Sequence, residues 1–173
     1  KDILTTHAVY WPTMLMSAGI ELPKTIFAHG WWLMGESKMS KSLGNVINPM
    51  DLIDDYGVDP VRYYLMREMV LGQDSSFTME SFIQRYNSDL ANDFGNLLSR
   101  VSTLMKKNFG GKIPEPGDFT EAEAVIKSNG ELLGEVVKEK IEAMRLNEAI
   151  EEIMQYIRSV NKYMENNAPW KLV

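Results

Sequence analysis

Two lysines three residues apart, within a short polar run, have a spacing that suits phosphate binding. The run consists of Lys38, Met39, Ser40, Lys41 and Ser42, and Leu43-Gly44-Asn45 follow directly. Each lysine ammonium is a compact charge with three hydrogen-bond donors, and serine hydroxyls and loop N–H groups add further donors for phosphate oxygens. No acidic residue lies between Ser37 and Asn48, so no neighbour in the sequence cancels this charge. The pattern predicts a loop that closes on a polyphosphate, although two lysines at this spacing are by themselves also typical of a solvated loop.

The five residues 38–42 with their Leu-Gly-Asn continuation resemble the nucleotide-binding loop of class I aminoacyl-tRNA synthetases. The resemblance implies that an amino acid carboxylate attacks the α-phosphate of ATP and that the acyl group then passes to tRNA. Negative charge grows on the phosphate oxygens in the first step, so it implies a catalytic role for Lys41 first and for Lys38 second. It also implies that residues 38–42 and His29 bind ATP, and that Mg²⁺ accompanies ATP, held mainly by phosphates and water.

The residues after this loop resemble the stem-contact segment that follows it in the same family. They are Asn48–Ile53, Tyr56–Asp59 and Arg62–Tyr64. Each of these pieces also fits an ordinary capped helix, so the indication comes from their combination and order.

The start of the chain resembles a segment that lines the methionine pocket of methionyl-tRNA synthetases, one family of this class. The matching residues are Lys1-Asp2-Ile3-Leu4 and His7–Pro12. The resemblance implies that Asp2 and His7 contribute to the methionine site, with His7 near the thioether sulfur, a weak hydrogen-bond acceptor. The sequence departs from the family at Thr6, where an aromatic residue is commoner, and this puts part of the pocket wall in doubt. A single histidine beside apolar residues is also typical of packing.

A second polar pattern lies further along, where Asn92, Asn96 and Arg100 are spaced four apart on one face of an expected helix. Gly95 beside them costs about 1 kcal/mol relative to alanine in a helix, which suggests close approach of another group. Asparagine and arginine can bond the edges of nucleic-acid bases, although a polar seam between helices also fits. The segment 92–100 resembles the anticodon-reading helix of methionyl-tRNA synthetases. This implies that Asn96 and Arg100 contact anticodon bases and that Trp170 stacks on one of them, while Trp170 also fits a hydrophobic plug at the end of a bundle.

Hydrophobic periodicity predicts a mixed fold with a boundary near residues 72–76. Residues 1–75 alternate short helices with a buried strand, and residues 76–173 are helical almost throughout, as in a bundle of antiparallel neighbours. The expected elements are a helix from Trp11-Pro12 to Gly19, a strand over Thr25–Leu33, a helix from Asn48-Pro49 that Gly57 stops, a helix from Asp59-Pro60 to about Val70, and three long helices beginning at Thr78, Thr120 and about Asn147. Gly110-Gly111 is expected to end the first long helix, and Thr120 with Glu123 is expected to form a capping box for the second. The apolar stripe expected on the second long helix consists of Val125, Leu133, Val136, Ile141 and Met144. Together with the resemblance, this implies the C-terminal part of a doubly wound α/β catalytic domain with a stem-contact segment, followed by an incomplete all-α anticodon-binding bundle.

Composition excludes several other classes of function. The 173 residues carry a net charge of −6, which argues against a broadly cationic nucleic-acid binder but not against a local RNA-binding patch. The absence of cysteine and the presence of only two histidines argue against a metal site, so any zinc of the family is expected outside this chain. No stretch is long and apolar enough to span a bilayer, so we expect no membrane partner. We expect a cytoplasmic protein, with an organelle left open.

The predicted function is ATP-dependent activation of methionine and its ligation to tRNA(Met), with methionine, ATP and tRNA(Met) as partners. The family's second nucleotide motif, with two histidines in the first βα turn, has no match here, so we expect the fragment alone to be inactive. Two alternatives stay open. One is another class I synthetase, for leucine, isoleucine, valine or cysteine; the other is a non-catalytic tRNA-binding module.

Overall fold

The computed structural model describes residues 3–35, 37–39 and 46–171. These residues are mostly helical and include one small sheet. They form two compact units, in which the described residues up to Ile47 associate with Met69–Phe77, and Asn48–Glu68 associate with the described residues from Thr78 onward. The helices just after the lysine run therefore pack with the later helices. The assignment of residues 1–75 and 76–173 to a catalytic end and an anticodon-binding bundle stays a prediction.

The first helix, α1, spans Trp11–Ala18 and is preceded by a π-helical turn over Thr6–Tyr10. Pro12 lies in the first turn of α1, and Gly19 ends the helix with a left-handed φ of 69°. Both signals were predicted, but helical structure begins before Trp11. A wider turn directly before a proline accommodates its ring and its missing N–H.

The sheet consists of β1 (Trp32–Met34), β2 (Ser37–Lys38) and β3 (Ser75–Phe77) in the order β2-β1-β3. β1 pairs antiparallel with β2 and parallel with β3. Just before β1, the backbone of Gly30 lies so close to Gln73 that a Cβ atom would be 1.8 Å from the Gln73 carbonyl oxygen. Only glycine fits this approach, which brings the chain before β3 alongside the start of β1.

The strand predicted over Thr25–Leu33 is wrong for most of its length. Within the described residues, its strand pairing begins only at Trp32, and Thr25 and Phe27 are exposed. Residues with high β-propensity favour a pleated, half-buried surface, but a strand also needs a neighbour for its backbone hydrogen bonds.

Two short helices follow, α2 (Pro49–Tyr56) and α3 (Val58–Glu68). The side chain of Asn48 caps α2 by accepting a hydrogen bond of 3.1 Å from the backbone N–H of Met50. Gly57 ends α2 with a φ of 88°. The predicted cap and stop are confirmed, and α3 lies within two residues of its predicted limits.

An aromatic cluster packs these two helices against the next one. The ring of Phe82 contacts those of Tyr56 and Tyr64 edge to face, with centroids 5.0 and 5.4 Å apart. Tyr64 and Phe82 are each only 1% exposed. Leu52 and Val61 complete the buried apolar residues of α2 and α3.

The long helix predicted from Thr78 has three consecutive parts: α4 (Met79–Arg85), a π-helical segment (Tyr86–Gly95) and α5 (Asn96–Phe109). Thr78 caps α4, as predicted, by accepting a hydrogen bond from the N–H of the third residue along. Gly110 ends α5 with a left-handed φ of 59°.

The π-helical segment was not predicted, and it accounts for Gly95. A Cβ atom on Gly95 would lie 3.0 Å from the carbonyl oxygen of Leu90, five residues earlier in the same helix. The close approach suggested by this glycine therefore comes from its own helix. A π turn bonds i to i+5 and brings these two positions together.

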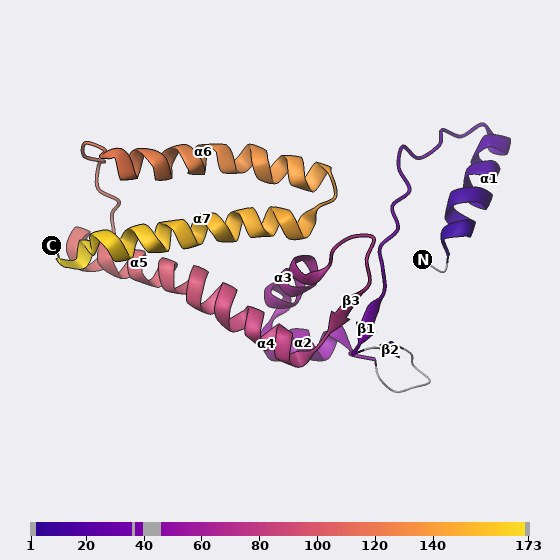
Figure 1. Ribbon diagram of the computed structural model, residues 1–173, viewed down its shortest axis with the longest axis horizontal. Helices are drawn as coiled ribbons and strands as arrows, with labels where there is room; N and C mark the ends of the chain where they lie inside the picture. The colour runs from indigo at the N-terminus through magenta and orange to yellow at the C-terminus, as the bar shows by residue number, and fades with distance from the viewer. Residues whose placement is uncertain (1–2, 36, 40–45, 172–173) are drawn as a thin grey trace. The chain divides into compact units, whose positions relative to one another are not determined.

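The last two helices, α6 (Glu121–Glu142) and α7 (Leu146–Asn167), run antiparallel and side by side (Figure 1). Thr120 and Glu123 form the predicted capping box at the start of α6. A short 3₁₀ turn, Pro169–Lys171, follows α7.

The buried stripe predicted for α6 is only partly correct. Leu133 and Val136 are half-buried, but Val125, Ile141 and Met144 are exposed. Val125 and Ile141 lie near the two ends of α6, and Met144 lies beyond its last residue, Glu142. α7 is better covered: its buried residues are Ala149, Met154 and Met164.

A search of the described residues finds no helix that is both long and apolar enough to cross a membrane.

Candidate functional sites

The lysine run begins at the edge of the small sheet. Lys38 is the last residue of β2, where its backbone pairs with Leu33 of β1. Met39 follows and is half-buried. Ser40, Lys41 and Ser42 lie outside the described residues, as does Asp2. Their predicted roles in binding ATP and methionine therefore stay predictions.

A first hollow, of about 330 Å³, lies in the unit that contains α1. Most of its wall is apolar, and it contains both histidines of the chain. The lining residues are Ile3, Leu4, His7, Trp11, Pro23, Thr25, Ile26, Phe27, Ala28 and His29. The structure thus brings together the histidine expected at the methionine site and the one expected at the nucleotide.

Local backbone contacts orient both imidazole rings. The Nδ1–H of His7 donates to the carbonyl oxygen of Ile3, one helical turn earlier, at 2.9 Å. The Nδ1–H of His29 donates to the carbonyl oxygen of Gly30 at 2.6 Å. When Nδ1 carries the proton, the Nε2 of a neutral ring is an acceptor. Trp11 contacts His7 edge to face, with ring centroids 6.3 Å apart.

The chemistry of this hollow suits a small ligand with an apolar part and a polar end. Its volume lies at the lower end of the range for ligand pockets, which are mostly apolar with a few placed polar groups. Two imidazoles on an otherwise apolar wall meet that description.

A second hollow, also of about 330 Å³, lies between α5 and the turn after α7. Its lining residues are Ser99, Arg100, Thr103, Leu104, Lys107, Asn108 and Trp170. Arg100 and Trp170 are 70 positions apart in the sequence, and both were predicted to contact the anticodon. The structure brings these two together, whereas Asn96 is exposed one turn earlier on α5, outside this hollow.

The second hollow combines an aromatic face with cations. Trp170 is 47% exposed, so one part of its indole is accessible to a stacking partner. The Arg100 side chain is 41% exposed, and its Nη1 lies 3.5 Å from Oε1 of Glu165. Lys107 adds a second cation, and Asn108 adds an amide. Proteins that bind single-stranded nucleic acid combine positive charge with such stacking platforms.

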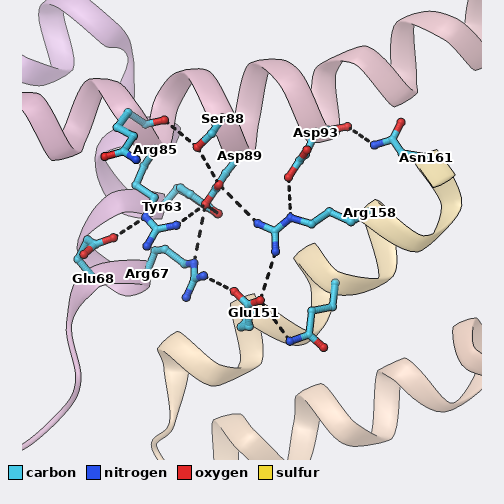
Figure 2. A network of polar contacts seen from close by, with 12 residues as sticks. Tyr63, Arg67, Glu68, Arg85, Ser88, Asp89, Asp93, Glu151, Arg158 and Asn161 are labelled. Atoms are coloured by element: carbon cyan, nitrogen blue, oxygen red, sulfur yellow. Dashed lines mark hydrogen bonds and ion pairs between the residues drawn. The ribbon is translucent and has the colours of Figure 1, made fainter.

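A third group of polar residues was missed by the sequence analysis. It centres on Asp89 in the π-helical segment, whose side chain is 2% exposed (Figure 2). The hydroxyl of Tyr63 donates to its Oδ2 at 2.7 Å, and the hydroxyl of Ser88 donates to its Oδ1 at 3.0 Å. The guanidinium groups of Arg85 and Arg158 lie 3.4 and 3.6 Å from the same carboxylate.

Further ion pairs extend this network over α3, α4 and α7. Arg67 of α3 lies 3.8 Å from the Asp89 carboxylate and also pairs with Glu151 of α7. Arg85 pairs with Glu68 at 2.5 Å, and Arg158 donates from Nε to Asp93 at 2.8 Å. The only sequence signal was one aspartate inside a helical pattern, and its three arginine partners lie in different helices.

The network perturbs the protonation of its members in the expected directions. Burial, together with the hydrogen bond to Asp89, raises the pKa of Tyr63 well above its usual value. The hydrogen bond to Asp93 raises the pKa of Arg158. Tyr63 therefore stays a protonated donor, and Arg158 stays charged.

Comparisons with known proteins agree on one family. The family model described as tRNA synthetases class I (M) matches residues 1–102. The chain is 47% identical to a methionine–tRNA ligase of Mycobacterium leprae over 172 residues, which are 99% of this chain and 32% of that protein. It is 45% identical to the ligase of Clostridium acetobutylicum, over 99% of this chain and 27% of that protein.

Solved structures give the same result. The crystal structure of Mycobacterium tuberculosis methionyl-tRNA synthetase bound by methionyl-adenylate matches with a TM-score of 0.95 and 45% identity. That match covers 99% of this chain and 34% of the other. The apo form of the same enzyme matches with a TM-score of 0.89 and 41% identity. The chain spans about a third of the length of these relatives.

Proposed function

The chain belongs to the methionyl-tRNA synthetases, a family of class I tRNA synthetases, and we propose that it serves the ATP-dependent activation of methionine and its ligation to tRNA(Met). The observation that carries this proposal is the pairing of Arg100 with Trp170 at one hollow. It brings an exposed indole and two cations from distant segments to one hollow, a combination that proteins binding single-stranded nucleic acid use.

We assign residues 1–75 to the end of a doubly wound catalytic domain with its stem-contact segment, and residues 76–173 to an anticodon-binding bundle. The first hollow, which contains His7 and His29, is the proposed methionine pocket. Its apolar wall suits the methionine side chain, and His7 supplies a polar contact near the thioether. Asp2 belongs to the same proposed site.

At the nucleotide, Lys38 and Lys41 are the proposed catalytic cations of residues 38–42, with His29 beside the ATP. An ammonium placed at the α-phosphate stabilises the charge that grows there as the adenylate forms. Mg²⁺ would be held mainly by ATP phosphates and water. The support is the order of residues in the run and the position of Lys38 at the sheet edge.

At the RNA end, Asn96, Arg100 and Trp170 are the proposed anticodon contacts. Stacking of an unpaired base on Trp170 uses the exposed part of the indole. Arg100 supplies paired N–H donors for a base edge.

The reaction is tested by ATP–pyrophosphate exchange with the full-length protein against each of the twenty amino acids. Exchange with methionine alone supports the proposal. Exchange with leucine, isoleucine, valine or cysteine keeps the class and overturns the methionine pocket. Absence of exchange with every amino acid favours a non-catalytic tRNA-binding module.

The anticodon role is tested separately by Trp170→Ala. Loss of one base stack should raise the KM for tRNA(Met) by roughly 5- to 150-fold, because stacking is worth about 1–3 kcal/mol per base. Phe119→Ala is the matched control, since this aromatic residue is 52% exposed and lies outside the hollow. Equal KM values for the two variants would contradict the assignment of Trp170.

A further inference from the structure

A charged residue in the middle of a packed helix needs an explanation beyond stability. Asp89 is 2% exposed, and its carboxylate is surrounded by one phenol, one serine hydroxyl and three guanidinium groups. A buried ion network commonly stabilises a fold no better than well-packed apolar residues would, because the charges must be desolvated. What such a network provides is geometric: it is satisfied in one arrangement of its helices and in few others.

The contacts of Arg158 show which arrangement is fixed. Its Nη2 lies 3.6 Å from Asp89, and its Nε bonds Asp93 at 2.8 Å, so one planar guanidinium spans two aspartates that are four residues apart in the π-helical segment. Its Nη1 bonds Glu151 of α7 at 3.2 Å, which holds the side chain against its own helix. Rotating or sliding α7 by one residue would break the two contacts that cross to Asp89 and Asp93.

A second contact, from the next turn of α7, has the same effect. The side-chain N–H of Asn161 donates to the backbone carbonyl oxygen of Asp93 at 2.9 Å. Two consecutive turns of α7 are therefore bonded to the π-helical segment, as Figure 2 shows for Arg158 and Asn161.

Both walls of the second hollow lie on the helices that these contacts join. The π-helical segment continues directly into α5, which carries Arg100, seven residues after Asp93. α7 leads to the turn that carries Trp170, twelve residues after Arg158. At 1.5 Å per residue, the distance along the helix axis is roughly 10 Å from Asp93 to Arg100 and roughly 18 Å from Arg158 to Trp170. A tilt of about 5° at Arg158 would move the indole by about 1.5 Å, well above the roughly 0.5 Å to which a binding site must be held.

We propose that Asp89, Asp93 and Arg158 form a positioning site that sets the register between α7 and the π-helical segment, and so holds Trp170 over Arg100 for base stacking. These residues act through the helices and do not touch the RNA. This proposal rests on the proposed anticodon role of the hollow.

The test is steady-state aminoacylation by the full-length protein carrying Arg158→Gln, with intact tRNA(Met) and with a truncated tRNA that lacks the anticodon arm. We expect the KM for intact tRNA(Met) to rise roughly tenfold, within the range for a lost base stack. Activity on the truncated tRNA and methionine-dependent pyrophosphate exchange should stay within about twofold. Arg158→Lys should restore only part of the loss, because one ammonium cannot span both aspartates as the guanidinium fork does.

The matched control is Arg145→Gln. Arg145 also bonds acidic residues, Glu148 at 3.3 Å and Glu139 at 3.8 Å, but at the turn between α6 and α7. It should leave the KM for tRNA(Met) unchanged. Asp93→Asn, nearly isosteric and on the opposite helix, gives the same test should Arg158→Gln fail to fold.

The outcomes separate a positioning role from a merely structural one. A higher KM with intact tRNA(Met) alone supports the proposal. An unchanged KM, or equal losses on intact and truncated tRNA, overturns it. If Trp170→Ala impairs the enzyme and Arg158→Gln does not, the positioning site fails and the anticodon role stands. If neither variant affects the KM, the anticodon role fails and the positioning site with it.

Discussion

Two glycines in the interior of α6 should respond oppositely to the same substitution. A Cβ atom on Gly134 would meet nothing within 4 Å, whereas a Cβ atom on Gly130 would lie 2.5 Å from the hydroxyl oxygen of Tyr156 and 3.1 Å from its Cζ. Tyr156 belongs to α7, and its hydroxyl donates to the carbonyl oxygen of Ile126 at 3.3 Å. Gly130 is thus a point of close contact between the two helices, and Gly134 is a matched control one turn away.

The expected magnitudes follow from these distances. Gly134→Ala should stabilise the fold by about 1 kcal/mol, because alanine loses less backbone entropy in a helix. Gly130→Ala has the same gain, but the tyrosine must move. This costs about 1 kcal/mol for the hydrogen bond to Ile126 and about 1–3 kcal/mol for overpacking. The net effect of Gly130→Ala is then a loss of roughly 1–3 kcal/mol.

Thermal unfolding followed by circular dichroism measures both variants. Gly134→Ala should raise Tm by about 2–4 °C, and Gly130→Ala should lower it by about 2–12 °C. Tyr156→Phe removes the oxygen nearest the added methyl, so Gly130→Ala should cost less in that background, as a double-mutant cycle would show. If both alanines stabilise the protein equally, the packing of α6 on α7 described here is wrong.

Three further predictions concern other parts of the chain. The hydrogen bond from Thr120, followed by that from Tyr163, lowers the pKa of Glu123 from 4.5 to about 2. A lowered carboxyl pKa contributes stability above pH 4.5 that is lost as the pH falls toward 2, so helicity should fall over this window, and less so in Glu123→Gln. Asn48→Ala removes the cap of α2 and should lower Tm by about 2–4 °C, whereas Asn48→Ser, which keeps an oxygen that can accept from the Met50 N–H, should lower it less. Lys41→Ala should slow adenylate formation roughly 100- to 1,000-fold in rapid-quench assays with little change in methionine affinity; an unchanged rate would remove Lys41 from the site.

Local signals in the sequence were sufficient for the limits of the helices. The cap by Asn48, the capping box of Thr120 and Glu123, and the stop at Gly110 each involve residues within a few positions of one another. Their hydrogen bonds form within one turn, so the chemistry of adjacent side chains decides them.

Features that depend on distant partners were not predictable in this way. The strand expected over Thr25–Leu33 failed because strand pairing is decided by neighbouring backbone, here that of β2 and β3. The π-helical segment breaks the 3.6-residue period on which a shared face for Asn92, Asn96 and Arg100 was based. The close approach of Gly95 to the Leu90 carbonyl, which the π-helical segment requires, leaves no pattern of apolar residues in the sequence.

The notable residues of the two hollows were singled out by resemblance rather than by spacing. Nothing in the intervals between His7 and His29, or between Arg100 and Trp170, requires these pairs to meet. The ordered match to a family singled out these four residues, His7 for methionine, His29 for ATP, and Arg100 and Trp170 for the anticodon, and the structure brings each pair to one hollow.

The Asp89 network shows why the remaining information is hard to obtain from sequence. The residues with recognisable chemistry, such as Arg100 and Trp170, are exposed, because they must reach a ligand. The residues proposed to hold them in place are more buried and belong to no motif, because their role depends on which side chains the neighbouring helix presents to them. Asp89 is almost fully buried, yet its carboxylate contacts α7 and its segment continues into α5, so it is connected to both walls of the second hollow. If the hollow needs a fixed helix register, substitutions in this network should impair RNA binding at a distance from any RNA contact, which distinguishes a positioning network from one that merely stabilises the fold.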